Sequence, residues 1–207
     1  HPHGVPKEDI KICRVVREAV SDGVVLMLDP VARYNYVEAL RVGRAIEELG
    51  YHWYEEPMPE TDIYGYAKLC QDLDIPVMAP ETAPGGFAAV GQFVLLKAAD
   101  ILRSDVARRG GITGMMKTAH LAEAFELNCE PHTGGNSINN VANVHVIMAT
   151  PNVEYFEHIL PVERHQWGLV ADISVDEQGR IHAPAGPGLG FDLDWEIIKR
   201  HTTEVAS

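Results

Sequence analysis

The feature that most constrains the fold of this 207-residue chain is a series of six polar residues that follow apolar runs at nearly constant spacing. They are Asp29, Glu55, Glu81, Asp105, His132 and Glu157, and the intervals between them are 26, 26, 24, 27 and 25 residues. A charged side chain after an apolar run is costly to bury unless it is paired or binds a metal. Six such residues in phase therefore indicate a repeated structural unit.

Each interval holds one strand-length apolar run and one segment of helical period. The pattern predicts strands over residues 24–29, 52–56, 76–81, 100–105, 128–132 and 153–157. It predicts helices over residues 7–21, 36–49, 63–73, 87–97, 112–125, 137–148 and 195–201. In the first helix we expect Ile12, Val15 and Val16 to form the buried face, and we expect Gly50 to cap the second helix.

Alternating strands and helices imply a parallel sheet, either a doubly wound open sheet or a (β/α)₈ barrel. In a barrel the carboxyl ends of all strands meet at one mouth, whereas an open sheet gathers its ligand at one switch point. Six polar strand ends favour a TIM-type barrel, and no glycine-rich nucleotide motif follows any strand. We therefore predict a partial barrel of about six βα units over residues 1–160 and a packed C-terminal extension over residues 161–207.

Six strands cannot close an eight-stranded barrel without leaving an open edge. We therefore expect the chain to be part of a longer enzyme.

The charge balance limits the partners that the chain can have. It carries 17 Lys and Arg against 30 Asp and Glu, a net charge of −13, which argues against nucleic acid and anionic membranes. No stretch approaches the run of about 18 apolar residues that a bilayer span needs. The three cysteines, Cys13, Cys70 and Cys129, form no CxxC pair, so we expect reduced thiols in a cytoplasmic protein.

Three consecutive predicted strands end in the carboxylates Asp29, Glu55 and Glu81. In adjacent barrel strands these groups would repel one another, and a divalent cation resolves the repulsion. All-oxygen ligation suits Mg²⁺ or Mn²⁺ better than Zn²⁺. The alternative is that each carboxylate caps a helix or pairs with a nearby Arg or Lys.

The next strand ends, Asp105 and His132, suggest acid/base chemistry, because a carboxylate beside an imidazole orients it and raises its pKa. A purely structural role for His132 is the alternative. Glu157 would lie opposite, either donating a hydrogen bond to a developing oxyanion or orienting a substrate hydroxyl. Arg108 is the best candidate among Arg103, Arg108 and Arg109 to contact a substrate carboxylate, with an ordinary loop charge as the alternative.

Six short segments resemble the C-terminal barrel domain of the enolase superfamily, mandelate racemase subgroup. They are Leu26-Met27-Leu28-Asp29, Trp53-Tyr54-Glu55-Glu56-Pro57, Ala79-Pro80-Glu81-Thr82, Ser104-Asp105 with Gly110-Gly111-Ile112-Thr113-Gly114, and Cys129-Glu130-Pro131-His132. The resemblance implies that Asp29, Glu55 and Glu81 bind Mg²⁺ and that His132, backed by Asp105, is an acid/base. It places Glu157 as the last-strand glutamate and implies a homo-oligomer.

The resemblance also implies a shared reaction step and a longer chain. The step is removal of the proton α to a substrate carboxylate, with a metal-stabilised enediolate as the product. An N-terminal capping domain and the first strands would precede His1. The second strand often ends in Lys-x-Lys or Lys-x-His, which makes His1 a candidate base and His3 a candidate substrate contact. One departure is that Asp29-Pro30-Val31 stands where many members have Asp-x-Asn.

The leading functional prediction is dehydration of an acid sugar, an aldonate or aldarate, to a 2-keto-3-deoxy acid. A racemase or epimerase of a 2-hydroxy acid would use the same site. A truncated, inactive barrel fragment is a third alternative. A Zn²⁺ hydrolase that uses His1-Pro2-His3 with Asp105 and His132 is a fourth, but it leaves the three carboxylates unexplained.

Overall fold

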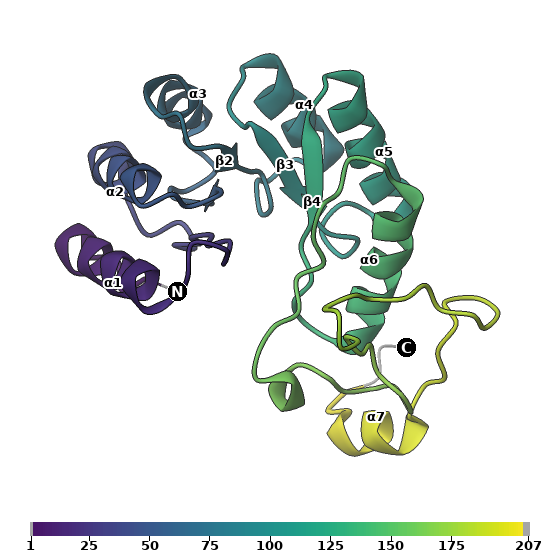
Figure 1. Ribbon diagram of the computed structural model, residues 1–207. Coiled ribbons are helices and arrows are strands. Elements are labelled where there is room, and N and C mark those ends of the chain that lie inside the picture. The colour runs from purple at the N-terminus through teal and green to yellow at the C-terminus, as the bar shows by residue number, and fades with distance from the viewer. Residues whose placement is uncertain (1, 205–207) are drawn as a thin grey trace.

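A parallel four-stranded sheet forms the centre of the computed structural model, which describes residues 2–204 (Figure 1). The strands are β1 (Tyr54–Glu55), β2 (Val77–Met78), β3 (Ile101–Ser104) and β4 (Asn128–Pro131). They are hydrogen-bonded in sequence order, so that Tyr54 pairs with Val77, Met78 with Ile101 and Ser104 with Pro131. A doubly wound sheet reverses its strand order partway, and the described sheet has no such reversal, as in a barrel.

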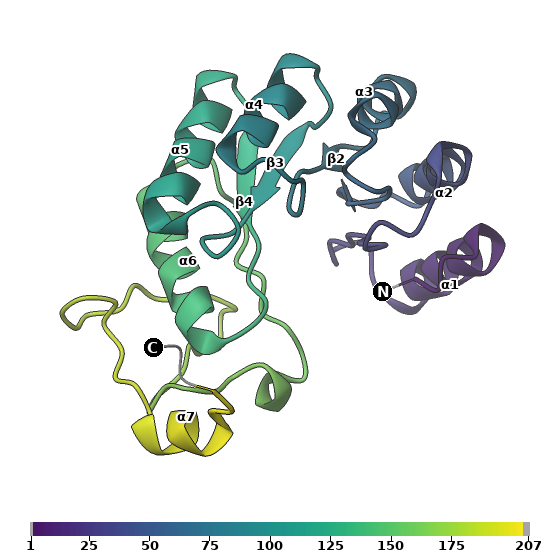
Figure 2. The same cartoon turned by 180° about the vertical axis from the view of Figure 1, so that it is seen from behind.

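Helices cover the outer side of this sheet, and both views show them following one another around an arc (Figures 1 and 2). Every predicted helix is confirmed, with each end within two residues of its predicted position. Among the helices of residues 2–204, none combines the length and hydropathy that a bilayer-crossing segment requires. The helices are α1 (Pro6–Ala19), α2 (Tyr36–Glu48), α3 (Ile63–Asp72), α4 (Phe87–Leu95), α5 (Gly111–Ala124), α6 (Ser137–Ala149) and α7 (Trp195–His201).

Local signals explain where several helices begin and end. The side chain of Asn35 accepts a hydrogen bond from the Glu38 amide, and the Glu38 carboxylate accepts one from the Asn35 amide, which forms a capping box at α2. Asn136 caps α6 through the Asn139 amide. Gly50 follows α2 with a φ of 68°, the left-handed conformation predicted for it.

Two of the six predicted strands are not strands in the structure. Residues 24–29 run beside β1 but form only an isolated bridge, Leu28 to Tyr54, supported by the bonds His52 N–H to Leu26 O and Glu55 N–H to Leu28 O. Residues 153–157 are also irregular. Each segment flanks the sheet and has a strand of the described sheet on one side only, so it lacks the second ladder of hydrogen bonds that regularises a central strand.

The predicted buried face of α1 is wrong. Ile12, Val15 and Val16 are 45%, 55% and 39% exposed, whereas Asp9 and Cys13 are the buried residues. Helix α1 lies at one end of the arc, with α2 beside it (Figure 1). The buried Asp9 carboxylate accepts hydrogen bonds from the Tyr34 hydroxyl (2.8 Å) and from the His3 and Gly4 amides, which satisfies a polar group at that position.

The sheet is buried on both faces, as is usual for parallel sheets. The main core lies between the sheet and the helices and contains Ile46, Tyr66, Leu69, Phe93, Leu102 and Met115. A smaller cluster of Trp53, Met78 and Ile101 lies apart from this core, with Met27 packed against it. All three cysteines are free thiols, as predicted.

The segment after residue 160 packs on α6 rather than extending the sheet. Its Leu169 and Ile173 form an apolar cluster with Val141 and Val144 of α6. The Ser137 hydroxyl at the start of α6 bonds the Asp172 carboxylate and accepts the Trp167 N–H. Apart from α7, the segment contains one short 3₁₀ turn, Val162–Arg164, among its described residues.

We predict that Gly114→Ala lowers the free energy of unfolding. A Cβ at this position in α5 would lie 1.6 Å from the carbonyl oxygen of Arg109, so the backbone must move. Overpacking of this kind costs about 1–3 kcal/mol or more.

Gly91→Ala in α4 is the matched control, because a Cβ there meets nothing within 4 Å. It should raise the free energy of unfolding by about 0.5–1 kcal/mol through helix propensity. Urea denaturation followed by circular dichroism measures both variants. Equal stability of Gly114→Ala and the parent would contradict the close approach of α5 to residue 109.

Candidate active site

The three carboxylates predicted as metal ligands lie at one end of the sheet. Glu55 is the last residue of β1, Glu81 follows β2 by three residues, and Asp29 is the last residue of the segment that runs beside β1. Glu55 and Glu81 are buried. Asp29 accepts the Val31 amide at 2.8 Å, so the turn at Pro30 is closed by the aspartate itself.

The guanidinium of Arg103 stands among these carboxylates. Its Nε is 2.7 Å from Glu55 and 3.9 Å from Glu81, and its Nη2 donates to Glu157 at 2.7 Å. Arg103 is in β3 and only 4% exposed, so its guanidinium group is buried within these ion pairs. The alternative that the carboxylates pair with arginine is thus realised for Glu55 and Glu81.

Burial works against ionisation of all three carboxylates. It raises the pKa of Glu55 to about 8, with the charge of Arg103 opposing the rise. Burial also raises the pKa of Glu81, against the opposing charges of His132, Arg103 and Arg108. The pKa of Asp29 is raised by burial as well. A positive charge placed among Asp29, Glu55 and Glu81 therefore favours the ionised form of all three carboxylates.

The donor chemistry of this group fits a divalent cation. Within residues 2–204, four carboxylates, Asp29, Glu55, Glu81 and Glu157, share the guanidinium groups of Arg103 and Arg108. This leaves an excess of negative charge with oxygen donors only, which is the set that Mg²⁺ prefers. In the described part of the chain no three acidic, His or Cys side chains converge closely enough to hold a metal as they stand.

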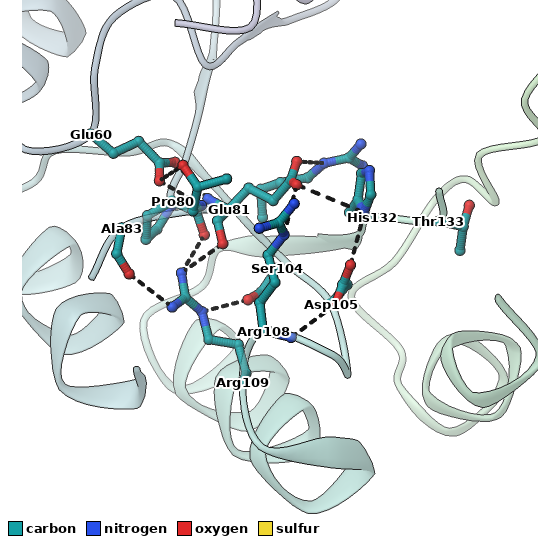
Figure 3. Close-up of polar contacts among 12 residues, drawn as sticks. Glu60, Pro80, Glu81, Ala83, Ser104, Asp105, Arg108, Arg109, His132 and Thr133 are labelled. Atoms are coloured by element: carbon teal, nitrogen blue, oxygen red, sulfur yellow. Dashed lines mark hydrogen bonds and ion pairs between the residues drawn. The ribbon is translucent and has the colours of Figure 1, made fainter. Parts of the chain in front are cut away.

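Asp105 and His132 form the predicted pair at the ends of β3 and β4 (Figure 3). His132 Nδ1 lies 2.9 Å from Asp105 Oδ2 and 3.8 Å from Glu81 Oε1. Burial would lower the pKa of His132, but its bond to Asp105 and the charge of Glu81 outweigh burial and raise it. Burial would raise the pKa of Asp105, but the bonds from His132 and from the Arg108 amide lower it.

Glu157 and Arg108 complete the group. Glu157 accepts from Arg103 and from the Thr133 amide at 3.1 Å, and the Thr133 hydroxyl bonds its carbonyl oxygen. Arg108 Nε lies 3.1 Å from Glu81, and nearly half of its side chain is exposed. Arg108 is therefore the arginine of this group that a ligand can reach.

The two N-terminal candidates are His1 and His3. His1 lies outside the described residues. His3 is exposed, and its backbone amide bonds Asp9 of α1. No hydrogen bond or ion pair links the His3 side chain to residues 2–204.

Glu60 was missed from sequence, and Arg103 and Arg109 were considered there only as possible contacts to a substrate carboxylate. Arg103 had a signal, since a charge inside the buried run Ile101-Leu102-Arg103-Ser104 must be paired. Glu60 and Arg109 had none, and they fix the backbone around Glu81 from two sides (Figure 3). Arg109 is 6% exposed, with every donor group engaged by the protein, so it cannot contact a substrate.

The arrangement can move a proton beside a cation site. Nδ1 of His132 is held by Asp105, which leaves Nε2 to exchange a proton with a ligand. Gly134 keeps that edge of the ring open, because a Cβ there would lie 2.7 Å from Nε2. An imidazole of raised pKa next to clustered carboxylates suits chemistry on an anionic substrate whose charge a metal neutralises.

Comparisons with known proteins identify relatives of this chain. L-talarate/galactarate dehydratase of Salmonella typhimurium is 32% identical over 198 residues, which are 94% of this chain and 46% of that protein. The crystal structure of D-glucarate dehydratase from Agrobacterium tumefaciens, complexed with magnesium, is 38% identical with a TM-score of 0.86, covering 97% of this chain and 52% of that one. A magnesium-bound racemase from Streptomyces coelicolor is 26% identical with a TM-score of 0.83, covering 94% and 51%.

The chain spans about half the length of the curated relatives that it matches. The solved structures that it resembles are barrel enzymes of the kind predicted. Residues 1–197 match the family described as enolase C-terminal domain-like. This chain therefore belongs to the enolase C-terminal domain-like family.

Proposed function

We propose that this chain is the barrel part of a Mg²⁺-dependent acid-sugar dehydratase. The observation that carries the proposal is the Asp105–His132 pair, whose imidazole lies 3.8 Å from Glu81 in the carboxylate group. An acid beside clustered oxygen donors matches the need to protonate a departing β-hydroxyl next to a carboxylate whose charge a metal neutralises. Relatives named as talarate/galactarate and glucarate dehydratases support the substrate class.

Each residue has a role in this proposal. A divalent cation held by Asp29, Glu55 and Glu81 would supply the positive charge that makes the α-proton removable. The α-proton goes to a separate base, for which His1 is the candidate. His132 holds a proton at Nε2 and gives it to the β-hydroxyl, which leaves as water, while Asp105 fixes the ring. Arg108, on the exposed side of Glu81, binds an anionic group of the substrate.

A racemase or epimerase is the second candidate, because the Streptomyces coelicolor racemase has the same fold. It would use the same metal and the same pair, with a second base on the opposite face of the substrate, so that a proton leaves one face of a carbon and another is added to the other face. The Zn²⁺ hydrolase alternative fits less well, because it needs Asp105 and His132 as separate ligands, whereas here they bond to each other.

We predict that the protein converts an aldonate or aldarate to a 2-keto-3-deoxy acid when Mg²⁺ is present. His132→Asn should lower kcat by about 10²- to 10⁴-fold, the usual contribution of an acid/base. Glu55→Gln and chelation of divalent cations should also abolish turnover. A colorimetric assay for 2-keto-3-deoxy acids measures all of these.

Glu48→Gln, an exposed carboxylate on α2, is the control and should leave turnover unchanged. Full activity of His132→Asn would overturn the proposal. Exchange of an α-proton with solvent, without keto acid, would favour the racemase or epimerase instead. If neither keto acid formation nor α-proton exchange is detected, the inactive barrel fragment is favoured.

We predict that Asp105→Asn lowers kcat more than it changes KM. The asparagine keeps the size of Asp105 but removes the charge that orients His132 and supports its protonated form. The expected loss in kcat is about 10²-fold or more. Steady-state kinetics measure it, and a variant with unchanged kcat would show that Asp105 is not needed by the acid/base.

We predict that Arg103→Met destabilises the metal-free protein and strengthens its response to Mg²⁺. Removing one partner from buried ion pairs costs about 3–5 kcal/mol, because Glu55 loses its internal cation. Mg²⁺ should then raise the melting temperature more in this variant than in the parent. Arg44→Met, at an exposed position on α2, is the control, and equal Mg²⁺ responses in all three proteins would contradict the prediction.

A further inference from the structure

The backbone of Glu81 is held on its amide side by a buried carboxylate, Glu60 (Figure 3). Glu60 Oε1 accepts the Glu81 N–H at 2.5 Å, and its Oε2 accepts the Thr82 N–H at 2.6 Å and the Thr82 hydroxyl at 3.0 Å. Glu60 is 6% exposed and comes from the loop between β1 and α3. One carboxylate thus receives three donors from two consecutive residues.

The carbonyl side of the same loop is held by Arg109, from the loop after β3. Its Nη2 donates to the carbonyl oxygens of Glu81 at 3.0 Å and Pro80 at 3.2 Å. Its Nη1 donates to the carbonyl of Ala83 at 3.1 Å, and its Nε donates to the Ser104 hydroxyl at 2.6 Å. The guanidinium therefore ties residues 80–83 to the end of β3.

We infer that Glu60 and Arg109 are positioning residues that clamp both sides of the Glu81 peptide unit and so set the direction of its carboxylate toward a bound divalent cation. Neither side chain contacts the carboxylate of Glu81, which instead faces Arg108 and His132. The inference rests on the proposed function, since it assumes that Glu81 is a metal ligand.

Burying the charged side chains of Glu60 and Arg109 costs desolvation free energy, which indicates a role beyond filling space. A carboxylate and a guanidinium are both buried, yet among the described residues they form no ion pair with each other and bind backbone groups instead. Apolar side chains would fill such a position at lower desolvation cost. Charged groups make strong, directional hydrogen bonds to backbone amides and carbonyls. Such bonds suit the loop of residues 80–83, in which the Glu81 side chain must keep a fixed direction.

The chain supplies a matched control at the other end of β2. Glu47 of α2 accepts the Asp74 N–H at 2.6 Å and the Ile75 N–H at 2.8 Å, the same two-amide pattern. These bonds hold the loop that enters β2, whereas Glu60 holds the loop that leaves it. Both clamps are carboxylates that accept two consecutive backbone amides. Glu47 does so through Oε2 alone and Glu60 through both oxygens, and Glu60 is the one that borders the carboxylate group.

The test compares Glu60→Gln with Glu47→Gln, using Mn²⁺ alone as the probe. Glutamine keeps the size of glutamate but replaces one accepting oxygen with an amide that cannot accept an N–H. Mn²⁺ affinity is measured by electron paramagnetic resonance, and stability by urea denaturation. We expect both variants to lose stability, and Glu60→Gln alone to lose about 10- to 100-fold in Mn²⁺ affinity.

Thr82→Val provides a milder variant if Glu60→Gln does not fold. It removes one hydrogen bond from the same clamp and should lower Mn²⁺ affinity by a smaller factor. Unchanged Mn²⁺ affinity in the folded Glu60 or Thr82 variants would overturn the positioning role. An equal loss of affinity in Glu47→Gln would also overturn it, because the effect would then be general destabilisation.

The same titration separates this inference from the proposed function. Tight Mn²⁺ binding by the parent that is lost in Glu55→Gln supports the metal site, whatever Glu60→Gln does. Absence of Mn²⁺ binding in the parent overturns both the metal site and the positioning role.

Discussion

Carboxylates that are buried together must be supplied with positive charge, and the rest of the site depends on this constraint. Glu55 and Glu81 lose hydration at the ends of adjacent strands, so their ionised forms depend on neighbouring cations. Arg103 is buried in β3 because it meets that need from within the sheet. The same negative field helps to raise the pKa of His132, which joins the acid/base pair electrostatically to the carboxylate group.

The second constraint is the shortness of the strands. β1 and β2 have two residues each, so few ladder bonds fix the loops that leave them. Carboxylates take over part of that role, since Glu47, Glu60 and Glu130 each accept the amides of two consecutive residues next to a strand or strand-like segment. Glu130 reaches the amides of residues 154 and 155 in this way. The loops that carry the site are therefore fixed by charged side chains as much as by the sheet.

These two constraints explain how much could be predicted from sequence. Helices were predicted to within two residues because period and caps such as Asn35 and Gly50 are local signals. The polar strand ends identified Glu81, Asp105 and His132 because their phase is visible in the sequence. Glu60 was invisible, because its bonds reach a residue 21 positions away and depend on the fold. The exposed face of α1 was mispredicted because amphipathic spacing does not say what covers a helix.

The bonds of Glu157 bear on the choice between its two predicted roles. Its carboxylate accepts from the Arg103 guanidinium at 2.7 Å and from the Thr133 amide at 3.1 Å. Both bonds are those of an acceptor, and one of them is an ion pair with the buried Arg103 guanidinium. A carboxylate that already serves as an acceptor in both of these bonds is placed to accept a hydrogen bond from a substrate hydroxyl as well. The geometry thus favours Glu157 as the group that orients a substrate hydroxyl, which suits elimination of a hydroxyl by His132 better than stabilisation of an oxyanion.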